Sequence, residues 1–160
     1  MAGSTTKKAV VRRYDREALM GYINPASYLQ PLGLELLSEE GKLSVVPYNE
    51  IKWVCFVRDF KLDGDERRTF LTRPKMTGLW VSFKFRDGDV MEGVMTNNLL
   101  QVEPSGFTFI PPDSFGNLQR IFAPRASLRS VEILGVVGSP LTKRKVQPVS
   151  KEQIGLFEET

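Results

Sequence analysis

The sequence predicts an all-β protein built from two tandem, five-stranded, strongly bent antiparallel barrels with a short C-terminal tail. Apolar and polar residues alternate in short runs separated by Gly, Pro, Asn and Asp, as is typical of short strands joined by turns. The layout of residues 81–134 recurs in the first third of the chain. A chain of 160 residues with 41% hydrophobic content is long enough for two small domains.

The first predicted barrel covers residues 9–57. It begins with a hairpin that turns at Asp15 and Arg16, and Gly21 favours the bend that a barrel strand needs. A short helical turn is expected after Pro47, because proline fixes its own φ angle and polar residues follow. The last expected strand, residues 52–57, has too many apolar residues for a strand with a solvent face. The expected strands are AVVRRY (9–14), EALMGYI (17–23), LELL (34–37), LSVV (43–46) and KWVCFV (52–57).

Residues 58–80 are predicted to be a linker or an excursion that covers a barrel edge. The segment is charged, is interrupted by Gly and Pro, and has few periodic apolar positions. Its ERRTFLTR core (66–73) could instead form an extra strand across a barrel edge, with Phe70 and Leu71 as the buried contacts.

The second predicted barrel covers residues 81–135, and its spacing matches that of the first. Residues 9–23 align with 81–95 at an offset of 72, and later segments align at offsets of 73 and 77. Most matched residues are turn, bend or strand-breaking residues, which have structural reasons for their positions. We therefore predict an internal duplication whose second copy has a longer third loop, PPDSFGN (111–117). The matched positions are Asp15 with Asp87, Gly21 with Gly93, Asn24 with Asn97, Pro31 with Pro104, Gly33 with Gly106, Pro47 with Pro124, Ile51 with Leu128 and Val54 with Val131.

The second barrel resembles the Sm fold. The resemblance rests on the Asp87-Gly88 turn, on Gly93 in a bent second strand, on Asn97 after that strand, and on a helical turn PRASL (124–128) before the fifth strand. It extends more weakly to residues 9–57. The chain is also similar to bacterial proteins built on Sm-like barrels.

The Sm resemblance implies an RNA site. In Sm proteins the loop after the second strand and the turn before the fifth line that site, which implicates Asn97, Asn98 and Arg125. The first copy departs from the pattern, because Asn24 stands beside Pro25 and Tyr48 replaces Arg125. The alternative is structural: these are ordinary turn residues, and Phe83, Phe85, Phe107 and Phe109 alternate as core residues do, unlike an aromatic stacking platform.

The composition argues against an enzyme and against a bound cofactor or metal ion. The chain has no histidine, which is the usual general base near neutral pH and the commonest metal ligand. The single cysteine, Cys55, has no base in sight and is expected to be a small buried apolar residue. GVVGSPLTK (135–143) lacks the P-loop spacing, and the acidic turn at 63–66 has too few ligands for calcium.

A cytoplasmic location is expected. One cysteine forbids an intramolecular disulfide, which fits a reducing compartment. The segment MAGSTTKK lacks the apolar core of a signal peptide, and no apolar run approaches the roughly 18 residues of a membrane span. The net charge of +3 permits contact with nucleic acid without requiring it.

Residues 136–160 are predicted to be a flexible tail with a linear motif. Gln153, Ile154, Leu156 and Phe157, within QIGLF, resemble the peptide by which bacterial proteins bind the DNA sliding clamp. The glutamine amide orients such a peptide, while large apolar side chains fill a preformed pocket. The alternative is a helical turn, capped by Ser150, that docks on the protein's own surface.

These features favour a non-enzymatic interaction or adaptor protein whose protein partner is the DNA sliding clamp. An Sm-like RNA-binding protein is the alternative. As a third hypothesis, Arg67, Arg68 and Arg73 could clamp the phosphates of a cyclic dinucleotide as in the PilZ family, although the spacing differs and the D-x-S-x-x-G motif is absent. We expect a pseudo-dimer within one chain, because pairing the barrels would satisfy one sheet edge.

Overall fold

A computed structural model describes residues 6–62 and 66–138. These ranges contain eleven strands and three short 3-10 turns but no α-helix, so the all-β prediction is confirmed. The same ranges hold no helix with the length and apolar character needed to cross a membrane. The strands are β1 (Lys7–Arg13), β2 (Leu19–Ile23), β3 (Leu29–Gln30), β4 (Gly33–Leu37), β5 (Leu43–Val46), β6 (Ile51–Val57), β7 (Gly78–Phe85), β8 (Val90–Met95), β9 (Gly106–Phe109), β10 (Leu118–Pro124) and β11 (Leu128–Val137).

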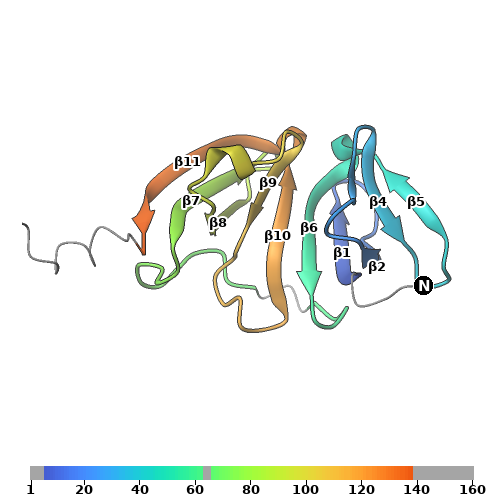
Figure 1. The fold of residues 1–160 in the computed structure, drawn as a ribbon, viewed down its shortest axis with the longest axis horizontal. Coiled ribbons are helices and arrows are strands. Elements are labelled where there is room, and N and C mark those ends of the chain that lie inside the picture. Colours follow the sequence, from blue (N-terminus) through green and yellow to red (C-terminus); the bar gives the residue numbers. More distant parts are fainter. Residues whose placement is uncertain (1–5, 63–65, 139–160) are drawn as a thin grey trace, which may run out of the picture.

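The predicted strands of the first half correspond to β1, β2, β4, β5 and β6, while β3 is a short strand that was not expected. The helical turn expected after Pro47 is η1 (Tyr48–Glu50), and the PRASL turn is η3 (Arg125–Ser127). A further turn, η2 (Leu99–Gln101), follows β8. We call β1–β6 the first unit and β7–β11 the second unit; they lie side by side in Figure 1.

The two units share one strand order. In the first unit the order is β5-β4-β2-β1-β6. In the second unit β11, β7 and β8 form a three-stranded antiparallel sheet, an isolated bridge joins Val94 to Ile110 just after β9, and β9 pairs with β10. When the two-residue strand β3 is left out and the other strands are numbered within each unit, both units follow the order fifth, first, second, third, fourth.

The pairing registers also match, at the same offsets of 72, 73 and 77 that align the sequence. Even the bulge recurs: Lys52 is the extra residue opposite β1, and Arg129, at an offset of 77, is the extra residue opposite β7. Register in a sheet is fixed by the alternation of buried side chains and by the turns, so this agreement extends over whole strands. Matched pairs are Ala9–Gly21 with Val81–Gly93, Val11–Val54 with Phe83–Val131, Leu34–Val46 with Phe107–Ala123, and Tyr22–Leu37 with Val94–Ile110.

The units join where β6 pairs antiparallel with β10, and we call this junction the seam (Figure 1). β6 is paired on both edges, with β1 and β10, and side chains on both of its faces are buried. Val54 and Phe56 point into the core of the first unit, whereas Trp53 and Cys55 belong to the core of the second. Conversely, Phe122 of β10, a strand of the second unit, packs in the core of the first unit. This arrangement explains why β6 carries no solvent face.

Side chains outside the strands also tie the units together. The Ser127 hydroxyl is fully buried, donates to the Lys52 carbonyl at 2.6 Å, and lies 2.6 Å from the Tyr14 hydroxyl. The Arg86 guanidinium lies over the Tyr14 ring and donates to the Asn49 carbonyl at 2.7 Å. These contacts join the turns η1 and η3 across the seam.

The segment 66–73 does not form the alternative extra strand. The Glu92 amide donates to the Arg68 carbonyl at 2.7 Å, but the Phe70 amide donates to the Glu92 carboxylate rather than to a backbone carbonyl. A β-ladder needs successive backbone bonds, so this pairing ends after one. Phe70 packs edge-on against Trp80, but Leu71 is 76% exposed, so the expectation that Leu71 is a buried contact is wrong.

Candidate functional site

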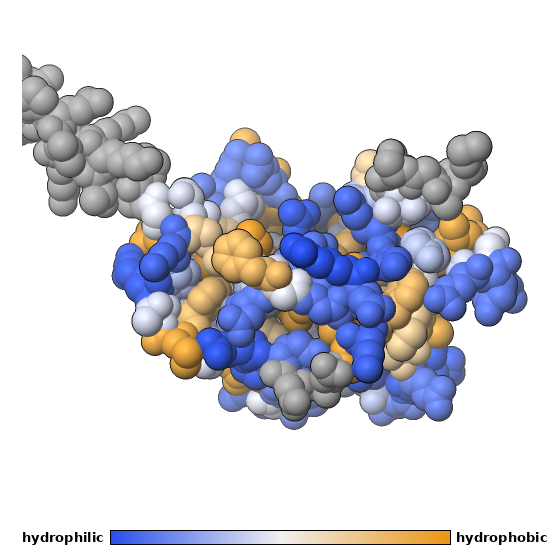
Figure 2. Space-filling view, turned by 90° about the horizontal axis from the view of Figure 1, so that it is seen from below, coloured by the Kyte–Doolittle hydropathy of each residue, from blue (hydrophilic) through white to orange (hydrophobic). Residues whose placement is uncertain are grey.

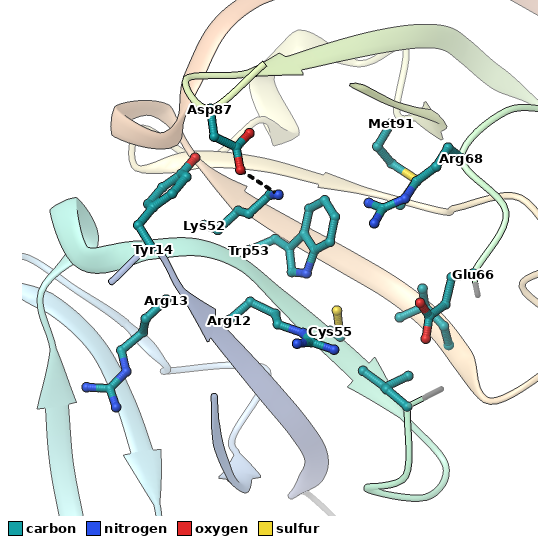
Figure 3. Close-up of a pocket in the computed structure, with 12 residues that line it drawn as sticks. Arg12, Arg13, Tyr14, Lys52, Trp53, Cys55, Glu66, Arg68, Asp87 and Met91 are labelled. Carbon is teal, nitrogen blue, oxygen red and sulfur yellow. Dashed lines mark ion pairs between the residues drawn. The ribbon is translucent and has the colours of Figure 1, made fainter. Parts of the chain in front are cut away.

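A pocket of about 330 Å³ opens beside the seam, and we call it the inter-unit pocket (Figure 3). Strands β1 and β6 of the first unit supply Arg12, Lys52, Trp53 and Cys55. The β7–β8 turn of the second unit supplies Asp87, and the excursion between the units supplies Arg68. The remaining lining residues are Arg13, Tyr14, Leu62, Glu66, Met91 and Leu118.

The Lys52 side chain forms ion pairs with two carboxylates of the second unit. Its position at the bulge of β6 brings Nζ to 2.7 Å from Asp87 Oδ2 and 2.9 Å from Asp89 Oδ2. Burial alone would lower the pKa of Lys52, but the bonds to Asp87 and Asp89 outweigh it, so the pKa is raised. For Asp87, burial acts to raise the pKa, yet the bonds from Lys52 and from the Asp89 backbone hold it below its ordinary value. The Lys52 amine is therefore charged at neutral pH and is bound to both carboxylates.

Two cations lie over the indole of Trp53. Lys52 Nζ and Arg68 Cζ are each 4.7 Å from the ring centroid, and Phe85 packs edge-on at 5.0 Å. Cations over an aromatic face are attracted by its quadrupole. Trp53 is only 7% exposed, so its side chain is held firmly among these neighbours.

The pocket contains two buried donors that make no hydrogen bond within the described part of the chain. They are Trp53 Nε1 and Arg68 Nη1. Arg68 Nη1 lies 3.2 Å from Asp89 Oδ2, which is an ion-pair distance, but the angles are not those of a hydrogen bond. Leaving a buried donor unsatisfied costs about 1–3 kcal/mol, so the Trp53 indole N–H, which has no partner, is the less stable of the two groups.

The only thiol of the chain is not activated. Burial raises the pKa of Cys55 to about 12, and the nearby Arg12 cation offsets only part of this effect. The thiolate, not the thiol, is the nucleophile, so Cys55 is poorly suited to covalent chemistry near neutral pH. Within residues 6–62 and 66–138, no group of three or more His, Cys, Asp or Glu side chains could hold a metal ion.

A second pocket, of about 530 Å³, is lined by Tyr28 and Phe56 of the first unit and by Phe115 of the β9–β10 loop. Burial raises the pKa of Tyr28 to about 12, while a bond with Thr108 acts to lower it. Tyr28 packs edge-on against Phe56 and against Phe122 of the seam. This pocket has no unpartnered buried donor among the described residues, so its polar groups define a ligand less well.

Two of the residues predicted to bind RNA, Asn98 and Arg125, are engaged in local structure. Asn98 caps η2 by accepting a bond from the Leu100 amide at 3.2 Å, and Asn97 is exposed. Arg125 Nε donates to the Pro104 carbonyl at 2.8 Å. Among the described residues, no hydrogen bond or ring contact joins Arg125 to either asparagine.

Tyr48 and Arg125, which the sequence alignment superimposes, play parallel roles. The Tyr48 hydroxyl donates to the Gln30 carbonyl at 2.6 Å, in the loop of the first unit that corresponds to the Pro104 loop of the second. The Arg125 guanidinium also lies 4.9 Å from the centroid of Phe107. Both side chains therefore hold the loop between the second and third strands of their own unit.

The other predicted sites are dispersed or lie elsewhere. Arg67 pairs with Asp113 at 3.5 Å, Arg73 donates to the Val136 carbonyl, and Arg68 enters the inter-unit pocket, so the three arginines form no common clamp. Gln153, Ile154, Leu156 and Phe157 lie outside the described residues.

Sequence reasoning missed the partnership of Lys52 with Asp87 and Asp89. These residues are far apart in the chain, and only the packing of the units brings them together. One signal was available: Lys52 precedes Trp53 in a strand that otherwise lacks a polar face, so its charge required a partner.

One comparison with known proteins finds a match. A model described as a family of unknown function, DUF6982, matches residues 5–135. This range covers both units except the last two residues of β11, and it ends before the segment that contains QIGLF. No curated protein and no solved structure matches the chain.

Proposed function

We propose that this chain, which belongs to the family of unknown function DUF6982, is a non-enzymatic adaptor built on two tandem Sm-like barrels. The matched strand orders and registers support an internal duplication, because two unrelated sheets would have no reason to share a bulge position. The order of the strands within each unit supports the resemblance to the Sm fold.

The observation that carries the adaptor function is that Lys52, whose side chain is 16% exposed, and the buried Ser127 hydroxyl are both committed to joining the units. Lys52, Asp87 and Ser127 bind one another's elements across the seam, and the Cys55 thiol is buried. Such groups stabilise a scaffold rather than provide a nucleophile with its activating base. A scaffold of this kind acts through the partners that it binds.

The proposed partner is the DNA sliding clamp, and the proposed contact is the peptide QIGLF. A chance match to such a motif is expected in about one per cent of chains of this length. Ile154, Leu156 and Phe157 would enter an apolar pocket, and Gln153 would set the orientation at its rim.

Titration calorimetry of the full chain with the host's clamp tests this function. Binding is expected for the unmodified chain, and the double variant Leu156→Ala/Phe157→Ala should weaken it by at least about tenfold. The matched control is Glu158→Ala/Glu159→Ala, which leaves the motif intact. Absence of binding by the unmodified chain would refute the clamp as the partner.

The unpartnered indole N–H of Trp53 and the neighbouring Arg68 guanidinium favour a second function, in which a small anionic ligand regulates the adaptor. Trp53 Nε1 and Arg68 Nη1 would donate to its oxygen atoms, as the cyclic-dinucleotide hypothesis requires of an arginine. Calorimetry with a cyclic dinucleotide and with inorganic phosphate separates the possibilities. Arg68→Gln should abolish the heat of binding, while Arg73→Gln should not. If neither probe binds, this second function is excluded for phosphate-bearing ligands.

A further inference from the structure

One cation of the inter-unit pocket has no partner in the parts of the chain that the structure describes. Lys52 and Arg68 pair with carboxylates of the second unit, and Arg13 donates to the Glu17 carbonyl at 3.0 Å. Arg12 also lines the pocket, but it makes no ion pair or hydrogen bond with any described residue. Its guanidinium is therefore available to a bound anion.

Arg12 lies beside the indole nitrogen of Trp53. The two residues are directly opposite each other on the antiparallel strands β1 and β6, so their side chains leave the sheet on the same face. In Figure 3 the nitrogen edge of the indole faces the Arg12 guanidinium. Trp53 Nε1 is buried and donates to no acceptor among the described residues. Two donors without acceptors therefore converge on one place in the pocket.

We propose that this place binds the carboxylate of a small organic acid, with Arg12 as its main partner. The guanidinium fork of arginine matches the two oxygen atoms of a carboxylate, and the Trp53 N–H would donate to one of them. The inference rests on the second function proposed above, in which the inter-unit pocket binds a small anion. It names the class of that anion and a further residue, Arg12, that holds it.

The charges of the pocket favour a single negative charge on the ligand. Lys52 and Arg68 are already engaged by Asp87 and Asp89, so they offer little attraction to a second negative charge. Glu66 also lines the pocket and would repel that charge. A carboxylate carries one negative charge near neutral pH, whereas a phosphate monoester carries about −1.5 to −2. The pocket therefore fits a monocarboxylate better than a phosphate monoester.

The remaining space fits an apolar body. Leu62, Met91 and Leu118 line the pocket together with the charged residues. Its volume of about 330 Å³ lies near the lower end of the range for small-molecule sites, about 300–1,000 Å³. Figure 2 shows a face that is largely hydrophilic in the middle of the molecule, where the units meet, and hydrophobic towards both ends. The apolar part of an acid is therefore better sheltered inside the pocket than on the middle of that face.

Proton–nitrogen correlation NMR of the full chain tests the proposal through the indole N–H signals of its two tryptophans. Titration with hexanoate should shift the Trp53 signal in a saturable manner, with a Kd of about 1 mM or tighter. Trp80 is the internal control, because its Nε1 already donates to the Glu92 carboxylate at 2.9 Å and its signal should not move. A Trp80→Phe variant assigns the two signals.

Variants identify the residue that holds the acid. Arg12→Gln should weaken hexanoate binding by at least about tenfold, because it removes the charged fork. Arg12→Lys keeps the charge without the fork and should lose less affinity. Arg16→Gln is the matched control, because Arg16 does not line the pocket and should leave the titration unchanged. The same spectra show whether each variant is folded. Equal hexanoate binding by Arg12→Gln would overturn the role of this residue.

Further probes separate the classes of ligand. Hexanamide keeps the apolar body without the charge, and acetate keeps the charge without the body, so each should bind at least about tenfold more weakly than hexanoate. Equal binding of hexanamide would overturn recognition of a carboxylate. If inorganic phosphate shifts the Trp53 signal and hexanoate does not, this inference fails while the second function stands. If no probe shifts it, a cyclic dinucleotide included, both fail.

Discussion

Strands β6 and β11 occupy the same place in their units yet have opposite environments. Each is the fifth strand, each pairs with the first strand of its unit in the same register, and each has a bulge at the same position. β6 is buried along almost its whole length, whereas most of β11 is exposed. Equivalent strands therefore pair in the same way with the first strand of their own unit. Whether it is buried depends on what lies on its other edge, which is β10 for β6.

The largest difference is expected between truncations at equivalent positions of β6 and β11. Phe56 and Ile133 correspond at an offset of 77 and are 8% and 61% exposed. Phe56→Ala removes a side chain that packs edge-on against Tyr28, and should lower the free energy of unfolding by about 3–4 kcal/mol. Urea unfolding measures the change.

Ile133→Ala is the matched control. Because the Ile133 side chain is largely exposed, this variant should change the free energy of unfolding by less than about 0.5 kcal/mol. Similar losses in both variants would show that the two strands share one environment, against the structure.

The third strands provide a comparison in which the units should behave alike. A Cβ atom added to Gly33 would collide with the Val46 carbonyl oxygen, and one added to Gly106 would collide with the Ala123 carbonyl oxygen. These contacts correspond by the same offsets. Gly33→Ala and Gly106→Ala should each lower thermal stability by about 1–3 kcal/mol, as overpacking does.

Gly116→Ala is the control for this pair, because a Cβ at that position meets only ordinary contacts. If only one of the variants Gly33→Ala and Gly106→Ala lowered the thermal stability, the two units would not be equivalent.

The bulge residues should differ by a smaller amount. Lys52→Met removes the ion pairs to Asp87 and Asp89 and should lower the free energy of unfolding by about 1 kcal/mol, since both carboxylates are partly exposed. The corresponding residue, Arg129, is bound only to the Arg86 carbonyl among the described contacts, so Arg129→Met should have almost no effect.

The Lys52 pair also predicts a pH dependence. Asp87 has a lowered pKa, so its contribution is present above its unfolded pKa of about 4 and is lost as the pH falls through the folded pKa. Lys52 has a raised pKa, so its contribution is present below about pH 10.4 and is lost as the pH rises through its folded pKa. Chemical unfolding across pH should show a smaller acid loss in Lys52→Met. An unchanged acid profile would contradict this account.

The smallest perturbation compares the reactivity of two thiols at equivalent positions, Cys55 of β6 and a cysteine introduced in place of Glu132 of β11. Cys55 is 2% exposed and its burial raises its pKa to about 12, so a maleimide or disulfide reagent at pH 8 should not label the native chain. Glu132 is its counterpart on β11 and is exposed. Glu132→Cys should therefore be labelled rapidly at one thiol per chain, as mass spectrometry would detect. Rapid labelling of the unmodified chain would mean that β6 is not covered.

Much of this fold could be predicted from the sequence, because its signals are local. Gly21, Gly93, Gly33 and Gly106 stand where strands approach one another closely, and their spacing revealed the offsets that the pairing registers then reproduced. The excess of apolar residues in β6 correctly indicated a strand without a solvent face.

The remaining features depend on contacts between distant segments. Phe122 enters the core of the first unit although it belongs to the second, and no local pattern shows this. The Phe70 amide donates its hydrogen bond to the Glu92 carboxylate and not to a backbone carbonyl. The segment therefore does not continue as a strand, and Leu71 stays exposed. Lys52, Trp53 and Arg68 form a site only because the units meet at the seam.

Hydrogen exchange of backbone amides tests most directly whether equivalent strands differ only through their neighbours. In dilute solution the amides of residues 51–57 should be strongly protected, whereas about half of those in 128–137 should exchange rapidly, since alternate amides of an edge strand point outward. Equally fast exchange of both segments in dilute solution would contradict the seam and the account built on it.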